Sequence, residues 1–163
     1  IFALPPIVEC SAYGSVIHEA REMQIMNFGQ YAHGNQPIQH MIYLYDWTDS
    51  PAKAGRWARQ VMDRLYRPTP DGYCGDEDNG QTSAWYVWSS LGFYPVCPGS
   101  GEYATGCPLF DRLDVRLPDG KTLTIRAAGA EAGKFPAAPR RFLRKADLDR
   151  GGEIVYRPAG DLL

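Results

Sequence analysis

The chain has 163 residues, of which 44% are apolar and 22% charged, so it can bury a core of ordinary size. Its formal net charge of -2 argues against a nucleic-acid-binding surface, which needs a basic excess. No apolar run approaches the ~18 residues that a membrane-spanning helix requires. The ten Tyr and four Trp side chains could fill a core or stack on sugars, and the core is the commoner use of any single ring.

The first two-thirds of the chain predict helices joined by loops. Residues 15–27 show a weak helical pattern. A clearer pattern follows Pro37, a residue type that suits the first position of a helix. Here apolar side chains recur at the spacing of one helix face: Ile38, Met41, Ile42 and Tyr45.

Two further helices are predicted with clearer ends. The first lies between Pro51 and Pro68 and carries a three-turn apolar stripe made of Ala54, Trp57, Ala58, Val61, Met62 and Leu65. The second runs from Thr82 to Leu91 and stops at Gly92, a residue type that often ends helices. Its predicted buried face consists of Ala84, Val87, Trp88 and Leu91.

The hydrophobic period changes to two after residue 108. Residues 113–117 and 123–127 alternate on either side of a Pro-Asp-Gly turn, which predicts an antiparallel hairpin. Residues 128–140 are rich in Ala, Gly and Pro and predict a loop, and residues 153–157 predict a last strand. The sequence therefore predicts an α+β chain, with a helical portion over 1–105 and a small antiparallel β portion over 106–163.

The run Gly75-Asp76-Glu77-Asp78-Asn79-Gly80 places three carboxylates together beside a Trp-rich helix. In an extended segment Asp76 and Asp78 would project to the same side and Glu77 to the other. Such a pair can activate a water as general base or bind a hard cation, whereas the alternative is a solvated surface turn. An EF-hand is excluded, because the required Gly and Glu are not at the sixth and twelfth loop positions.

The four cysteines, at positions 10, 74, 97 and 107, form no Cys-x-x-Cys pair, and no His stands at zinc-site spacing. They are compatible with disulfides or with free thiols. The opening Ile1-Phe2-Ala3-Leu4 lacks the charged start and cleavage site of a signal peptide, so we expect a piece of a longer protein. The residues alone leave the compartment undecided.

Four segments together resemble one family. Gly34-Asn35-Gln36-Pro37 is similar to the Gly-Asn-Glu/Gln-Pro signature of glycoside hydrolase family 92. The acidic loop running into Gly80-Gln81-Thr82-Ser83-Ala84-Trp85 resembles the family's acidic loop. Leu91-Gly92-Phe93-Tyr94-Pro95 and Gly106-Cys107-Pro108-Leu109-Phe110 follow in the family's order. The resemblance covers roughly residues 13–127, and four motifs in order are far more specific than one.

The resemblance implies a calcium-dependent exo-α-mannosidase that inverts the anomeric carbon of terminal, α-1,2-linked mannose in glycans such as N-glycans. It also implies a catalytic (α/α) toroid joined to a β-sandwich. Residues 1–105 would then be a partial toroid and residues 106–163 sandwich-like. In this family Ca²⁺ binds the mannose O2 and O3 hydroxyls and helps distort the ring. A secreted or periplasmic location is favoured on the same ground.

Site residues carry over by position. Asp78 matches the family's general base and Asp76 its carboxylate partner, while His18 and Glu19 match sugar-contacting residues. Asn35 and Gln36 fall in the signature loop near the metal, with Asp78 as a further candidate ligand.

The matching general acid is a Glu that would precede Ile1, and Glu9, Glu19 and Glu22 do not stand at its position. Inversion requires two carboxyl groups about 6.5–9.5 Å apart, so Asp76 and Asp78 are too close in sequence to be that pair. A family strand also has no counterpart in the short run 127–141. We therefore expect this chain to depend on an N-terminal portion of its parent protein and to be inactive alone. A non-catalytic mannose- or calcium-binding remnant and another toroid glycosidase are the alternatives.

Overall fold

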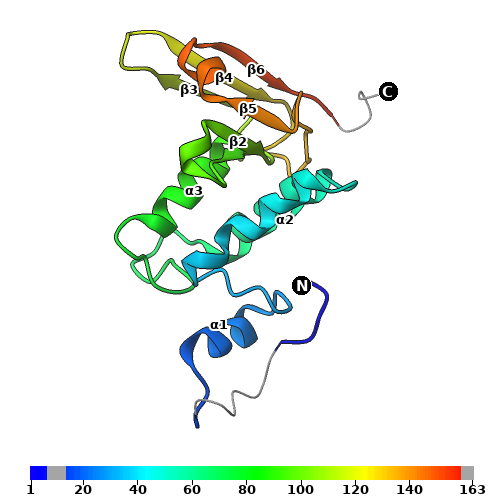
Figure 1. Cartoon of the computed structure of the whole chain (residues 1–163), viewed down its shortest axis with the longest axis vertical. Coiled ribbons are helices and arrows are strands. Elements are labelled where there is room, and N and C mark those ends of the chain that lie inside the picture. The colour runs from blue at the N-terminus through cyan, green and yellow to red at the C-terminus, as the bar shows by residue number, and fades with distance from the viewer. Residues whose placement is uncertain (7–13, 159–163) are drawn as a thin grey trace. The chain divides into compact units, whose positions relative to one another are not determined.

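A computed structural model describes residues 1–6 and 14–158, so Glu9 and Cys10 lie outside the described residues. The chain divides into two compact units, the first made of Ile1–Gln39 and Asp63–Ala84, the second of His40–Met62 and Trp85–Leu163. In chain order the elements are α1 His18–Met26, η2 Gln36–Trp47, α2 Ala52–Leu65, α3 Gln81–Leu91, β1 Phe93–Tyr94, η3 Pro98–Ser100, β2 Glu102–Thr105, β3 Arg112–Arg116, β4 Thr122–Ala127, β5 Phe142–Arg144, α4 Lys145–Asp149 and β6 Gly152–Tyr156 (Figure 1).

The helices predicted from the sequence are present. α1 falls within the weak pattern of residues 15–27, and α2 and α3 begin and end within two residues of their predicted bounds. α2 buries much of its predicted stripe, including Ala54, Ala58 and Val61. The helix predicted after Pro37 is η2, a run of 3₁₀ turns.

The predicted buried faces of η2 and α3 are wrong in part. The side chains that η2 buries are Gln39, Ile42, Tyr43 and Asp46, of which only Ile42 belongs to the predicted stripe. In α3 the buried residues include Thr82, Trp85 and Ser89, whereas Val87 is 56% exposed and Ala84 is exposed. The buried faces contain polar side chains that are satisfied by hydrogen bonds, so apolar periodicity alone could not find them.

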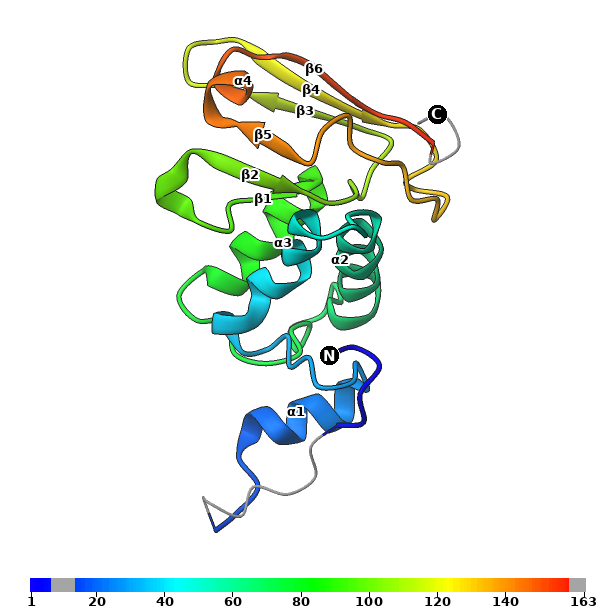
Figure 2. The same ribbon diagram turned by 45° about the vertical axis from the view of Figure 1, so that its right-hand side comes forward.

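Within the described residues of the second unit, the strands form two three-stranded sheets. One has the order β1-β2-β5 and is antiparallel throughout. The other has the order β3-β4-β6, with the three strands side by side in both views (Figures 1 and 2). It contains the predicted β3–β4 hairpin, and β6 joins β4 in parallel register, so this sheet is mixed. The α+β class is confirmed. The short elements β1, β2, β5 and α4 were not predicted.

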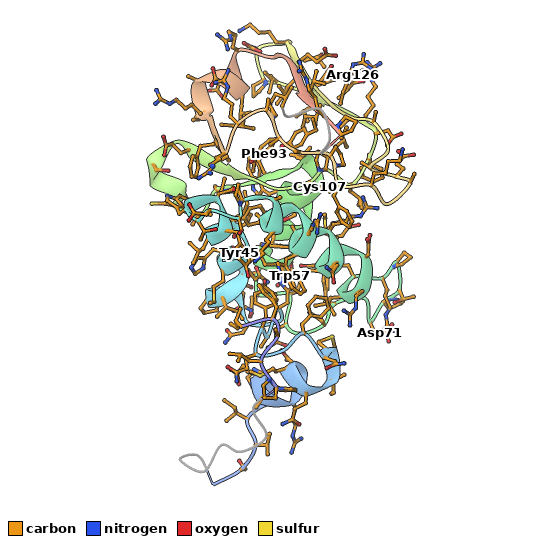
Figure 3. All side chains as sticks on the ribbon, turned by 90° about the vertical axis from the view of Figure 1, so that its right-hand side faces the viewer. Tyr45, Trp57, Asp71, Phe93, Cys107 and Arg126 are labelled. Carbon is orange, nitrogen blue, oxygen red and sulfur yellow. The ribbon has the colours of Figure 1, made fainter. Side chains whose placement is uncertain are left out.

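The core of the second unit is an apolar cluster between the strands and α4. It consists of Phe93, Leu123, Ile125, Ala127, Ala130, Leu143, Leu148 and Tyr156. Full burial of each large member stabilises the fold by roughly 1.5–3 kcal/mol. The hydroxyl of Tyr156 donates to the carbonyl of Gly92 at 2.7 Å, which ties β6 to the end of α3. Figure 3 shows Phe93 and Cys107, both 1% exposed, inside this unit and Arg126 on its β3–β4–β6 sheet.

The predicted loop 128–140 consists mainly of turns, with one bridge between Ala137 and Arg157. Arg59 donates from Nη1 to the carbonyl of Ala130 at 2.7 Å, so a side chain of α2 holds the start of this loop. Cys74, Cys97 and Cys107 are free thiols. Over the described ranges, no helix has both the length and the hydropathy to cross a membrane.

Candidate functional site

Of the three carboxylates in the acidic loop (residues 75–80), Glu77 has a structural role. Its Oε1 accepts hydrogen bonds from the hydroxyl of Ser83 at 2.5 Å and from the N–H of Ser83 at 3.3 Å. Its Oε2 accepts from the N–H of Gly80 at 2.7 Å. These bonds, led by that of the Ser83 hydroxyl, lower the pKa of Glu77. Glu77 therefore caps the N-terminus of α3 and stays ionised.

Asp76 and Asp78 remain exposed on the loop. The segment is not extended throughout, because Asp78 has φ 54° and Asn79 has φ 55°. The chain turns here into α3, with the N–H of Gln81 donating to the carbonyl of Asp78 at 3.2 Å. A left-handed backbone is costly for a residue with a side chain and is tolerated mainly by Asn and Asp. Such strain is often found at functional positions.

Glu22 of α1 lies against both loops that carry the predicted site. A Cβ added to Gly34 would come within 2.4 Å of Glu22 Oε2, and one added to Gly75 within 2.9 Å. The same two glycines touch each other, since a Cβ on Gly75 would lie 2.6 Å from the Cα of Gly34. The signature loop (residues 34–37) and the acidic loop therefore meet at two glycines, and the carboxylate of Glu22 contacts both of them.

The Oε2 atom of Glu22 is buried and has no hydrogen-bond partner, a situation shared by no other buried side-chain polar atom of the described residues. Burial raises the pKa of Glu22 above its ordinary value, and the charges of Asp76, Glu19 and Asp78 add to this, against an opposing effect of His18. Four predicted site residues thus act electrostatically on one carboxyl group. A cation bound here would give Oε2 of Glu22 a partner and would reduce the repulsion between the carboxylates.

The remaining predicted residues lie on the signature loop and at the start of α1. Asn35 and Gln36 directly follow Gly34 and are half-buried. His18 and Glu19 begin α1, and His18 Nε2 lies 3.4 Å from Glu19 Oε1, with the His18 side chain 68% exposed. The structure therefore brings the signature loop, the acidic loop and the start of α1 into one region of the first unit.

Sequence reasoning missed the position of Glu22. The available signal was its spacing of three from Glu19, which places both carboxylates on one helix face. Contact with Gly34 and Gly75 could not be inferred, because the three positions are distant in the chain.

The donor set suits a hard cation better than a transition metal. Among residues 1–6 and 14–158, no three His, Cys, Asp or Glu side chains are grouped so that they could hold an ion by themselves. A cation here would need amide oxygens as well, and Asn35 and Gln36 offer them beside Glu22 and the acidic loop. Oxygen-only coordination is the preference of Ca²⁺.

A cavity of about 560 Å³ in the second unit is a separate feature. Its walls are mostly Ala, Gly and Pro residues from the start of α2 and the run 134–141. None of the predicted site residues lines it, so it does not belong to the candidate site.

Comparisons with known proteins identify the family and the fold. The family model described as glycosyl hydrolase family 92 catalytic domain matches residues 11–153. The structure of a family 92 inverting mannosidase from Bacteroides thetaiotaomicron superposes with a TM-score of 0.76 at 48% identity, covering 96% of this chain and 22% of that one. A family 92 α-mannosidase from the same organism, in complex with mannoimidazole, gives a TM-score of 0.77 at 33% identity, covering 83% and 19%.

A curated relative, an uncharacterised secreted glycosidase of Arthroderma benhamiae, is 29% identical over 94 residues, which are 57% of this chain and 12% of that protein. The chain thus spans about a fifth of the length of the two mannosidases and less of this relative.

Proposed function

Because the chain belongs to glycosyl hydrolase family 92, we propose that the protein containing it releases terminal α-linked mannose, α-1,2-linked in particular, from glycans such as N-glycans. The observation that carries the proposal is the contact of the Glu22 carboxylate with both Gly34 of the signature loop and Gly75 of the acidic loop, where the charges of Asp76 and Asp78 also act on it. Two solved mannosidases of the same family support the choice of sugar.

In this proposal Asp78 is the general base of an inverting hydrolysis. Its carboxylate is exposed, so it can take a proton from a water that attacks the anomeric carbon. Asp76 lies two residues away and is its carboxylate partner on the same exposed loop. The general acid, 6.5–9.5 Å away across the sugar, would come from another part of the parent protein.

Ca²⁺ fits the oxygen donors of the site. Asn35, Gln36 and Asp78 would hold it, and the orphaned Oε2 of Glu22 provides a further oxygen in the same region. When bound, Ca²⁺ would supply a positive charge that orients sugar hydroxyls and offsets the repulsion between carboxylates. The exposed His18 ring and the Glu19 carboxylate would donate to and accept from the remaining hydroxyls.

The test is hydrolysis of an aryl α-mannoside by the full-length protein in calcium, with the anomer of the first-formed mannose followed by NMR. The proposal predicts β-mannose as the first product. The matching α-glucoside serves as the specificity control. Release of α-mannose would refute inversion, and binding of mannose without turnover would support a non-catalytic remnant instead.

A further inference from the structure

Thr82, the second residue of α3, is the centre of a buried hydrogen-bond network between the signature loop and the acidic loop. The side chain of Thr82 is 1% exposed and that of Gln39 is 0% exposed. A buried polar group without a hydrogen-bond partner destabilises the fold, so the polar groups of Thr82 and Gln39 are expected to be hydrogen-bonded.

On the side of the signature loop the link is the amide of Gln39. Its Nε2 donates to the carbonyl of His33 at 3.1 Å, directly before Gly34, and to Oγ1 of Thr82 at 3.2 Å. Its Oε1 accepts from Nε2 of Gln81 at 3.3 Å. Both N–H donors of the amide are therefore used, one toward each loop.

On the side of the acidic loop Thr82 makes two further bonds. Its hydroxyl donates to the carbonyl of Asp76 at 3.0 Å, and its N–H donates to the carbonyl of Glu77 at 3.1 Å. Two consecutive backbone carbonyls are thus held just before the left-handed turn at Asp78. The Asp76 and Asp78 side chains stay free of this network and face solvent.

A second route from the signature loop ends on the same residue. His33 lies between the Tyr31 hydroxyl, 2.7 Å from Nδ1, and the Tyr66 hydroxyl, 2.7 Å from Nε2. The Tyr66 hydroxyl donates to the carbonyl of Thr82 at 3.3 Å. Burial lowers the pKa of His33 to about 3, so the ring is neutral. Because the Tyr66 hydroxyl donates to Thr82, we assign Nε2–H as the donor to Tyr66 and Nδ1 as the acceptor from Tyr31.

We propose that Thr82 is a positioning residue for the hydrolysis: linked to the signature loop through Gln39, it fixes the backbone of Asp76 and so sets the placement of the carboxylates at 76 and 78. The inference rests on the proposed function. It adds that Thr82 is the residue at which both hydrogen-bonded routes between the two loops meet. The carboxylates then need no direct bond to any other side chain to be held in place.

The test uses the full-length protein and a matched pair of substitutions. Thr82→Val keeps the volume of the side chain and removes the hydroxyl, whereas Thr82→Ser keeps the hydroxyl. Ser89→Ala is the control, because Ser89 is also buried on α3 and accepts a 2.7 Å hydrogen bond from the Tyr43 hydroxyl, away from both loops. All variants are measured for kcat and KM on an aryl α-mannoside and for hydrogen exchange of the backbone.

The proposal predicts that Thr82→Val lowers kcat ~10- to 100-fold with little change in KM, the range typical of residues that orient a catalytic group. Thr82→Ser should retain most of the activity, and Ser89→Ala should keep kcat even if it lowers the melting temperature. Gln39→Leu combined with Thr82→Val should be no worse than the stronger single variant, because both remove the same link.

Hydrogen exchange separates this inference from the proposed function. In Thr82→Val, backbone amides of residues 33–36 and 75–80 should exchange faster together, and Ser89→Ala should leave both segments unchanged. If the unsubstituted protein fails to cleave mannosides, the proposed function fails, and the exchange pattern still decides on the coupling. Unchanged exchange in both segments, or equal losses of kcat in Thr82→Val and Ser89→Ala, would overturn the inference.

Discussion

Glu77 Oε1 lies 2.5 Å from the hydroxyl of Ser83, and this contact separates the structural carboxylate of the acidic loop from the two that remain exposed. Glu77 accepts hydrogen bonds from Gly80 and Ser83 at the start of α3, and Asp76 and Asp78 flank it in the chain. The residue that caps α3 and the two candidate catalytic residues therefore belong to the same short loop.

The cap predicts a pH-dependent loss of stability. Glu77→Ala should lower the melting temperature at neutral pH, because the N–H groups of Gly80 and Ser83 lose their acceptor. The pKa of Glu77 is lower in the folded chain than its ordinary 4.5, so its contribution is present above that value and is lost as the pH falls below it. Thermal unfolding from pH 7 to pH 3 measures this. Asp71→Ala, at an exposed position in the loop between α2 and α3 (Figure 3), is the control and should change the melting temperature little at any pH.

A second prediction concerns Asp46, a buried residue of η2. Its Oδ2 accepts a hydrogen bond from the N–H of Thr105 at 2.7 Å. Burial raises its pKa to about 7, against smaller opposing effects of that N–H and of Arg141. The folded chain therefore binds the proton more tightly than the unfolded chain, and stability should fall as the pH rises from about 4 to about 7.

Asp46→Asn removes the titrating group while keeping an acceptor for Thr105. It should stabilise the chain at pH 8 by about 1–3 kcal/mol and flatten the dependence of stability on pH over this interval. Urea unfolding at pH 5 and pH 8 measures both effects. If the variant is less stable than the original at pH 8, the interpretation of this carboxyl is wrong.

Calcium dependence is the third prediction. Activity of the full-length protein should disappear with a chelator and return with Ca²⁺, because the candidate ligands are amide and carboxylate oxygens. Glu22→Gln should weaken Ca²⁺ binding, measured directly by calorimetry, since it removes a negative charge from the point where both loops meet. Recovery with Zn²⁺ but not with Ca²⁺ would count against the assigned donor set.

The isolated chain provides a fourth prediction. Residues 1–163 alone should not hydrolyse mannosides at an enzymatic rate, because the general acid is expected from another part of the parent protein. Several large apolar side chains are exposed, among them Leu44, Trp47 and Val87, so the isolated chain should also self-associate. Activity assays with sedimentation analysis test both points, and a monomer with ordinary mannosidase turnover would contradict them.

The sequence predicted the elements well but the buried faces poorly. α2 and the β3–β4 hairpin follow apolar periodicity, and both are present. The faces of η2 and α3 do not follow it, because Gln39, Thr82 and Ser89 are buried polar residues with hydrogen-bond partners distant in the chain.

The short strands could not be predicted from hydrophobic alternation in the sequence. β1 has two residues and β5 has three, too few to show a period of two. Motif resemblance located the acidic and signature loops, yet the position of Glu22 depends on a meeting of Gly34 and Gly75 that only tertiary structure reveals.

The most direct test of the central claim compares two substitutions of exposed aspartates in the full-length protein. With saturating Ca²⁺ and an aryl α-mannoside, Asp78→Ala should lower kcat by at least the ~10²-fold typical of a lost general base, whereas Asp71→Ala should leave kcat unchanged. Near-normal turnover by Asp78→Ala, with the variant folded and Ca²⁺ bound, would contradict the assignment of Asp78 as the base.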